Sequence, residues 1–193
     1  MGLKKVLHTV KKAPSRLYNY LLLKYRHVQY GSNFKVNGRL FCVSNSINGI
    51  VIGNNVSINS CRASNPIGGD TRTHLFSKGN AKIRIGNNCG ISNATIFACE
   101  SITIGNSVLL GGGAKIYDSD FHWLNFERRI KETGGVSLPV IIKDGAFIGA
   151  HSLILKGVTI GERSIVGAGS VVTKDIPDGE IWAGNPAKFI RKV

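Results

Sequence analysis

A short segment near the middle of the chain brings together side chains that could perform acid–base chemistry. His122 closely follows Asp118 and Asp120, and Trp123 comes directly after it. An imidazole changes its protonation near neutral pH, so it can take a proton from an attacking hydroxyl group. A neighbouring carboxylate can orient such a ring and stabilise its cation. These residue types are suited to general acid–base chemistry, in which Asp120, Asp118 or backbone carbonyls would orient the imidazole of His122.

The cysteines do not show the spacing of a metal site. Cys42, Cys61, Cys89 and Cys99 are separated by 19, 28 and 10 residues, whereas structural zinc sites bring their ligands in close pairs. The N-terminus lacks the apolar stretch and cleavage site of a secretory signal, so disulfides are not expected either. We expect small, buried, free cysteines and no required metal.

These residues lie within a sequence repeat of six. Branched aliphatic residues recur at every sixth position in two parts of the chain, and glycine directly follows several of them. A period of six fits neither a helix of 3.6 residues per turn nor a simple hairpin alternation. It predicts a solenoid in which three hexads close a triangular coil and stacked coils bury one continuous core. The repeated positions are Ile104, Leu110 and Ile116, and then Ile142, Ile148, Ile154, Ile160, Val166 and Val172.

The repeat is interrupted where His122 lies. The distance from Ile116 to Ile142 is 26 residues, which is not a multiple of six. We expect residues 117–139 to leave the solenoid as an excursion, and loops held on a rigid scaffold commonly carry functional groups. A second excursion is expected near residues 63–79.

From about residue 50 to the end, the sequence resembles the hexapeptide-repeat acyltransferases, and most of all the maltose, galactoside and surface-polysaccharide O-acetyltransferases. The most specific matches are residues 102–122 and 140–191. The resemblance implies an all-β fold, a left-handed parallel β-helix. Its left hand follows from the resemblance alone, because general chain chirality favours right-handed crossovers. We expect residues 1–35 to form a helical extension and residues 36–193 the β-helix, closed by a small C-terminal cap.

The resemblance also implies an activity. It indicates an acetyl-CoA-dependent O-acetyltransferase that acts on a sugar hydroxyl of a surface polysaccharide or its precursor, with His122 as the general base. Asn93 is the nearest match to a sugar-binding asparagine of the family, and Asp118 is a further candidate for acceptor contact. Trp123 would either stack on a sugar ring or cover the loop.

Acetyl-CoA would lie along small residues of the last coils, with cations near the chain end for its phosphates. The family often has Trp at the position of Phe147 and Arg at that of Lys188, which leaves the exact contacts open. The candidates by resemblance are Gly149, Ala150, Gly167, Ala168, Thr173, Lys174, Lys188 and Arg191.

The resemblance implies a homotrimer in which each site lies between two subunits. Three other interpretations remain: a sugar N-acetyltransferase of the same fold, a γ-type carbonic anhydrase, and a non-catalytic scaffold that docks on membranes. The carbonic anhydrase would need three converging histidines, whereas His122 and His151 stand alone on their segments.

The N-terminal region is strongly basic. The chain has 25 Lys and Arg against 11 Asp and Glu, a net charge of +14, and residues 1–35 contain no acidic residue. Apolar residues at positions 3, 6, 7 and 10 predict one face of a helix. We expect Pro14 to end this helix and a second one to span Arg16–Tyr25. We expect residues 1–30 either to touch an anionic membrane surface from the cytoplasm or to pack on the protein. No transmembrane span and no nucleic-acid motif is recognisable.

Overall fold

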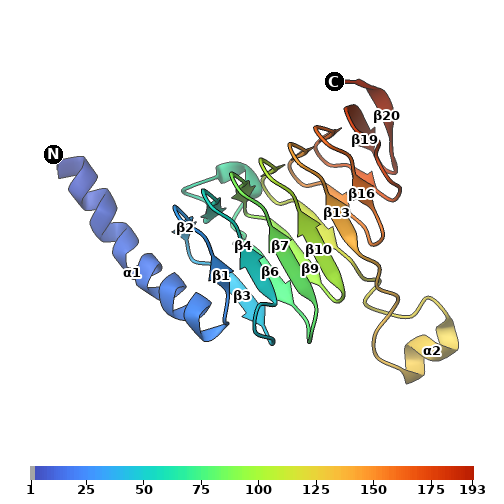
Figure 1. Cartoon of the computed structure of the whole chain (residues 1–193), viewed down its shortest axis with the longest axis horizontal. Coiled ribbons are helices and arrows are strands. Elements are labelled where there is room, and N and C mark those ends of the chain that lie inside the picture. Colours follow the sequence, from blue (N-terminus) through green and yellow to red (C-terminus); the bar gives the residue numbers. More distant parts are fainter. Residues whose placement is uncertain (1–2) are drawn as a thin grey trace.

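The computed structural model describes residues 3–193, with side chains from residue 14 onward. A single long helix, α1 (Leu3–Tyr25), precedes a stack of triangular coils, and the chain ends in a hairpin at the far end of the stack (Figure 1). Short strands form the three flat sides of each coil. The structure therefore has the solenoid architecture that the six-residue period predicts.

The three sides of the prism are three parallel sheets, named here A, B and C. Sheet A contains β1 (Gln29–Tyr30), β4 (Ile50–Ile52), β7 (Lys82–Ile85), β10 (Ser101–Ile104), β13 (Val140–Ile142) and β16 (Thr159–Ile160). Sheet B contains β2 (Lys35–Gly38), β5 (Ser57–Ser60), β8 (Gly90–Ser92), β11 (Leu109–Leu110), β14 (Phe147–Ile148) and β17 (Ile165–Val166). Sheet C contains β3 (Phe41–Ser44), β6 (His74–Ser77), β9 (Thr95–Ala98), β12 (Lys115–Tyr117), β15 (Leu153–Ile154) and β18 (Val171–Val172).

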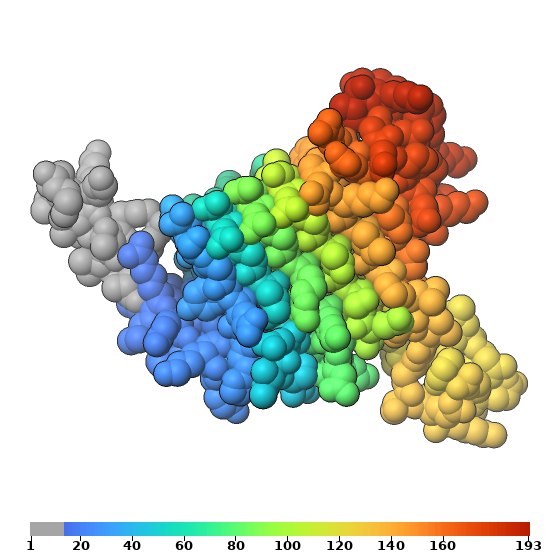
Figure 2. Space-filling view, viewed as in Figure 1, coloured from blue at the N-terminus to red at the C-terminus, as the bar shows by residue number. Residues whose placement is uncertain are grey.

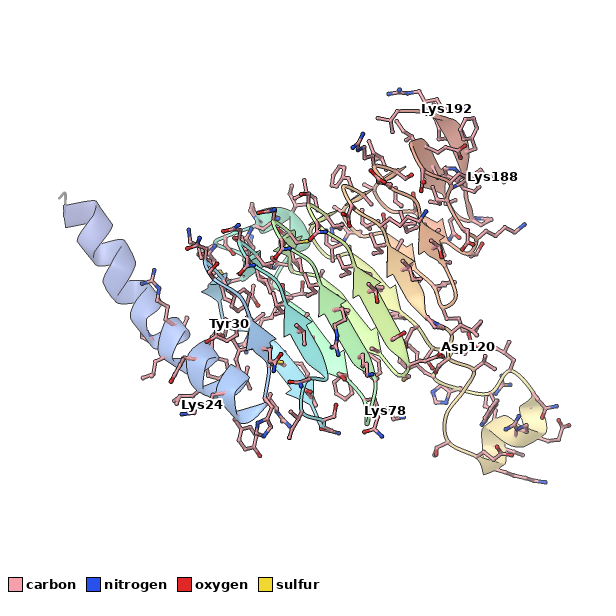
Figure 3. All side chains as sticks on the ribbon, in the orientation of Figure 1. Lys24, Tyr30, Lys78, Asp120, Lys188 and Lys192 are labelled. Atoms are coloured by element: carbon pink, nitrogen blue, oxygen red, sulfur yellow. The ribbon has the colours of Figure 1, made fainter. Side chains whose placement is uncertain are left out.

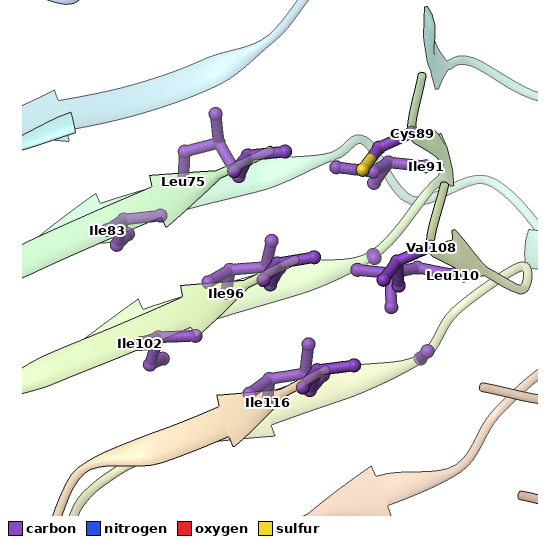
Figure 4. Packing of buried hydrophobic residues seen from close by; sticks show 14 of the residues in the cluster. Leu75, Ile83, Cys89, Ile91, Ile96, Ile102, Val108, Leu110 and Ile116 are labelled. Atoms are coloured by element: carbon purple, nitrogen blue, oxygen red, sulfur yellow. The ribbon is translucent and has the colours of Figure 1, made fainter. Parts of the chain in front are cut away.

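The repeated aliphatic residues form ladders inside the prism. Ile142 pairs in register with Ile104 below it and with Ile160 above it. All three are at most 2% exposed, because alternate residues of a strand point to opposite faces and these point inward. Figure 4 shows the same stacking in neighbouring coils, where Ile96 lies between Leu75 and Ile116. The predicted alignment of like side chains, coil above coil, is confirmed.

Two segments leave the stack. Residues 118–139, named here the His122 loop, connect β12 to β13 and carry the short helix α2 (Phe126–Lys131). This loop projects as a separate lobe in Figure 2, as the interrupted repeat predicts. Residues 61–73, named here the short loop, connect β5 to β6 and contain one 3₁₀ turn (Pro66–Gly68). The predicted second excursion was too long, because β6 already begins at His74 and pairs with β3 and β9.

The helix α1 differs from the prediction at Pro14. It runs through this proline without a break. Proline removes one N–H donor, and Pro14 is exposed, so water can bond the carbonyl that is left free. The side chains of Leu3, Val6, Leu7 and Val10 lie outside the described residues.

The C-terminal part of α1 is fixed to the first coil. The Asn19 side chain donates to the Gly38 carbonyl (2.9 Å) and accepts from the Leu40 amide (3.0 Å), and Leu23 joins the core. The β-helix starts at β1, ahead of the predicted boundary at residue 36. Within the part of the chain that the structure describes, no helix has the length and apolarity to cross a membrane.

Candidate active site

The corners of the coils line up along the edges of the prism, and two edges matter for function. The CA edge contains the turns that lead from sheet C to sheet A, and the BC edge those that lead from sheet B to sheet C. The His122 loop leaves the stack at the CA edge. Asp120 marks this point in Figure 3. Sheet C lies between the two edges.

A stem of backbone bridges holds His122 at a fixed place. Residues 119 and 122 bridge to residues 137 and 134, and the Asp120 amide donates to the Val136 carbonyl (3.0 Å). Gly135 packs directly on the backbone of His122, where a Cβ atom would come within 2.9 Å of both its nitrogen and its oxygen. The His122 residue itself is exposed. The loop therefore presents an accessible imidazole on a rigid backbone.

Aromatic packing fixes the residue before it. Phe121 has a left-handed backbone (φ 62°), and its ring packs edge-on against Phe97 (5.0 Å between ring centres) and Tyr117 (5.4 Å). Phe97 is in turn stacked on Phe76 at 4.3 Å. Sequence reasoning missed Phe121, because the packing depends on aromatic residues from three different coils.

The two aspartates of the His122 loop have different partners: Asp118 bonds to backbone amides, and Asp120 pairs with a lysine. Asp118 is fully buried and accepts from the amides of Cys99 (2.7 Å) and Glu100 (2.8 Å). Burial raises the pKa of this carboxyl group, and hydrogen bonds from backbone amides partly oppose the rise. Both of its oxygens are engaged inside the stack, and the contact of Asp118 with the acceptor stays a prediction. Asp118 anchors the start of the His122 loop.

Asp120 forms an ion pair with Lys156 of the next coil at the same edge, with 2.7 Å between Oδ1 and Nζ. The side chains are 20% and 25% exposed, so the pair is shielded in part from water. In one chain the contact of Asp120 is thus with Lys156, and its role as the carboxylate that orients His122 stays a prediction. Its partner is an ammonium group that the sequence pattern did not place near it.

Of the two readings of Trp123, the structure favours the cover. The guanidinium carbon of Arg128 lies 3.3 Å from the centre of the Trp123 ring, and Arg128 is also paired with Glu132 (3.0 Å). One face of the ring is thus occupied. Stacking of a sugar on the other face of Trp123 stays a prediction.

A pocket of about 330 Å³ lies beside the stem of the His122 loop. Its residues come from the CA-edge turns of three coils and from both sides of the stem. They are Lys78, Gly79, Cys99, Ser119, Phe121, Gly134, Gly135 and Ser137. The sequence did not reveal Lys78 or Cys99 as site residues, because their place at this edge depends on which turns carry the excursions.

The BC edge carries the small residues predicted to hold a coenzyme. Ala150 and Ala168 occupy equivalent turns of adjacent coils, and neither amide has a hydrogen-bond partner within the described part of the chain. Between them, Gly149 approaches the next coil so closely that a Cβ atom would lie 2.5 Å from the Ala168 nitrogen. Two free donors beside small side chains suit the amide groups of an extended ligand.

The short loop borders this row of donors. The His151 Nε2 atom lies 3.0 Å from the Ile67 carbonyl oxygen, and Gly112 packs against the backbone of Gly68. Asn93 is 1% exposed and donates to the Thr71 carbonyl at 2.6 Å. Asn93 therefore anchors the short loop at the BC edge, while its side-chain oxygen has no partner among the described residues, and its contact with the acceptor stays a prediction.

The remaining coenzyme candidates lie elsewhere. Thr173 and Lys174 are exposed at the CA edge of the last coil, and Lys188 and Arg191 are exposed on the terminal strand β20 (Ala187–Lys192). Within one chain, the predicted residues are not brought together, and His122 and the free amides lie on opposite sides of sheet C. Among the side chains described, no cluster of three His, Cys, Asp or Glu residues could hold a metal ion.

Known proteins with the same six-residue repeat are similar to this chain. Residues 139–174 match the family model described as bacterial transferase hexapeptide (six repeats). A putative acetyltransferase of Schizosaccharomyces pombe is 45% identical over 103 residues, which cover 52% of this chain and 48% of the relative. The galactoside O-acetyltransferase of Escherichia coli is 40% identical over 119 residues, which cover 61% of this chain and 57% of the relative. The chain thus spans about half the length of the curated relatives it matches.

Solved structures agree with the fold. A hexapeptide-repeat acetyltransferase from Vibrio cholerae, complexed with acetyl coenzyme A, is 27% identical with a TM-score of 0.60, covering 90% of this chain and 75% of that one. A galactoside acetyltransferase in complex with coenzyme A is 26% identical with a TM-score of 0.58. The match covers 90% of this chain and 68% of that one. These likenesses confirm the predicted fold. Residues 139–174 carry the hexapeptide repeat of these transferases, and the chain has the left-handed β-helix of the solved structures.

Proposed function

We propose that this protein is an acetyl-CoA-dependent O-acetyltransferase that modifies a sugar hydroxyl of a surface polysaccharide or its precursor. One observation carries the proposal: an exposed imidazole stands on a rigid stem at one border of sheet C, and a row of free backbone donors stands at the other. The family likeness and the coenzyme-bound relatives support the same activity.

The residues fit the coenzyme at the BC edge. The free amides of Ala150 and Ala168 would bond to its pantetheine arm, and the close approach at Gly149 leaves no side chain in the way. Lys188 and Arg191 would face its phosphates, for which exposed cations are suited. When bound, acetyl-CoA supplies an acetyl group as a reactive thioester.

His122 would perform the proton transfers. It takes the proton of the acceptor hydroxyl while the oxygen bonds to the acetyl carbonyl carbon. The carbon–sulfur bond then breaks, and the imidazolium returns the proton to the departing sulfur. The products are an acetyl ester and a free thiol, so atoms and charge balance without a metal or a further reactant.

We also propose that three copies assemble through sheet C. Its outer face is the most apolar of the three, whereas the outer face of sheet B begins with Lys35, Asn37, Ser57 and Asn59. Copies that turn this face toward a threefold axis would place the CA edge of one beside the BC edge of the next. His122 would then face the coenzyme of a neighbour. The outward apolar residues of sheet C are Phe41, Val43, Phe76, Phe97, Tyr117, Leu153 and Val171.

Coenzyme A binding tests the proposed activity first. A ligand at one hundred times its Kd that binds only the folded state stabilises it by about 2.7 kcal/mol. For a domain of this size, the expected rise in melting temperature is roughly 5–10 °C. The measurement is thermal unfolding with and without coenzyme A, followed by thiol release from acetyl-CoA with a panel of sugars and amino sugars. A melting temperature that coenzyme A leaves unchanged would contradict the proposal.

We further propose that α1 docks on the cytoplasmic face of an anionic membrane. Leu17, Leu21 and Tyr25 are 61%, 55% and 73% exposed and lie on one face of the helix. The first 35 residues contain cations and no acid, which suits an anionic lipid surface.

Replacing Leu17 and Leu21 by glutamate is expected to weaken binding to phosphatidylserine-containing vesicles about tenfold or more, because apolar burial is lost and charge repulsion is added. Co-sedimentation measures the effect. Leu124→Glu is the matched control, since Leu124 is 76% exposed on the His122 loop, away from α1. Equal sedimentation of all variants would argue that α1 has another partner.

A further inference from the structure

The pocket beside the His122 loop is lined by a positive charge, which indicates the class of acceptor that it could bind. Lys78 is the one cation among the residues that line it, and none of these residues is acidic. No ion pair engages Lys78 within the described residues, whereas both aspartates at this edge are engaged: Asp118 by the amides of Cys99 and Glu100, and Asp120 by Lys156. The ammonium group of Lys78 is therefore free to meet a ligand.

Hydroxyl groups complete the lining. Ser119 and Ser137 lie opposite each other across the stem. Ser119 Oγ accepts from the Phe121 amide at 3.1 Å, so its own hydrogen remains available to donate. An ammonium group and hydroxyl donors at the wall of one pocket match an oxyanion that accepts several hydrogen bonds.

The pocket is also next to the proposed base. Gly135 lines it and packs on the His122 backbone, and Phe121 lines it directly before His122 in the chain. Figure 3 shows Lys78 and Asp120 at the same edge of the prism. A sugar whose anionic group reaches Lys78 would have its hydroxyls in the neighbourhood of the imidazole.

We infer that the acceptor is an anionic sugar, bearing a carboxylate or a phosphate, whose charged group binds Lys78 in this pocket. The inference rests on the proposed function and adds the class of acceptor. The net charge of +14 acts in the same direction, because a positive field raises the local concentration and encounter rate of anions.

The test compares glucose, glucuronic acid and glucose 6-phosphate. Binding is measured directly by ligand-observed NMR titration, and acetylation by thiol release from acetyl-CoA. A charge-assisted contact of this kind corresponds to about a tenfold to hundredfold preference for at least one of the anionic sugars over glucose. The preference for glucuronic acid over glucose is compared with that for glucose 6-phosphate over glucose, and the larger one identifies the anion as a carboxylate or a phosphate. The preference should shrink as salt is raised, because an exposed ammonium is screened.

Lys78→Met is expected to reduce that preference about tenfold or more, and Lys78→Arg to retain most of it. Lys82→Met is the matched control, since Lys82 is an exposed lysine at the start of β7 that does not line the pocket. Equal binding of the three sugars, or a preference that Lys78→Met leaves intact, would overturn the inference. Preferential binding of an anionic sugar without acetyl transfer would instead contradict the proposed function and leave the binding site standing.

Discussion

Replacing His122 by alanine is expected to lower kcat for acetyl transfer about a hundredfold to ten-thousandfold, the usual contribution of a positioned general base. The side chain is exposed and its backbone is held by the stem, so the free energy of unfolding should stay within about 0.5 kcal/mol of the parent. Stabilisation by coenzyme A should be retained, because none of the predicted coenzyme contacts involves the His122 side chain. The measurements are steady-state kinetics and thermal unfolding of the same preparations.

His27→Asn is the matched control. His27 is exposed at the end of α1 with a left-handed backbone (φ 51°), a conformation that asparagine tolerates. This variant should keep full activity. If His122→Ala were as active as the parent, the imidazole would not be the base, and the reading of the chain as a non-catalytic scaffold would gain weight.

Mixing two inactive variants is expected to restore activity, since each proposed site takes its base from one copy and its coenzyme groove from the next. The first variant is His122→Ala. The second is Ala168→Trp, which fills the BC-edge turn where a free amide lies. In doubly tagged trimers, which contain both variants, about one third of the sites would combine an intact base with an intact groove. Co-expression with two affinity tags, followed by an assay of the doubly tagged trimers, measures the recovery.

The control is each variant co-expressed with a differently tagged copy of itself, and these doubly tagged trimers should stay inactive. Ala168→Trp should also lose the stabilisation by coenzyme A while keeping a cooperative unfolding transition. Doubly tagged trimers without activity would show that base and groove belong to the same copy. A protein that runs as a monomer at assay concentration while active would contradict the shared site more directly.

The regular part of the fold was predictable because the same six-residue repeat recurs in successive coils. A residue such as Ile142 must point inward and meet Ile160 one coil later, so the sequence alone specifies both its face and its register. The excursion after Ile116 was predictable for the same reason, since 26 residues cannot be divided into hexads. His122 was found because the loop that carries it is marked by that interruption.

The partners of individual side chains were not predictable. Asp118 and Asp120 are two residues apart, yet one bonds to amides of the preceding coil and the other to Lys156 of the next. These contacts depend on how the stem of the His122 loop folds, and the stem has no repeat to fix its register. The anchoring contact of Asn93 was missed for a similar reason, because the path of the short loop above it could not be read from the sequence.

The hairpin that ends the chain has a consequence for self-assembly. Strand β19 (Glu180–Gly184) continues sheet B in parallel, but β20 turns back and runs antiparallel to it. The open end of a solenoid is a template on which another molecule could add a further parallel coil. On sheet B that template ends in a reversed strand that carries Lys188, Arg191 and Lys192. The opposite end of the prism, which a head-to-tail neighbour would present, carries the exposed cations Arg16 and Lys24 of α1, so fibre growth along the prism axis is disfavoured.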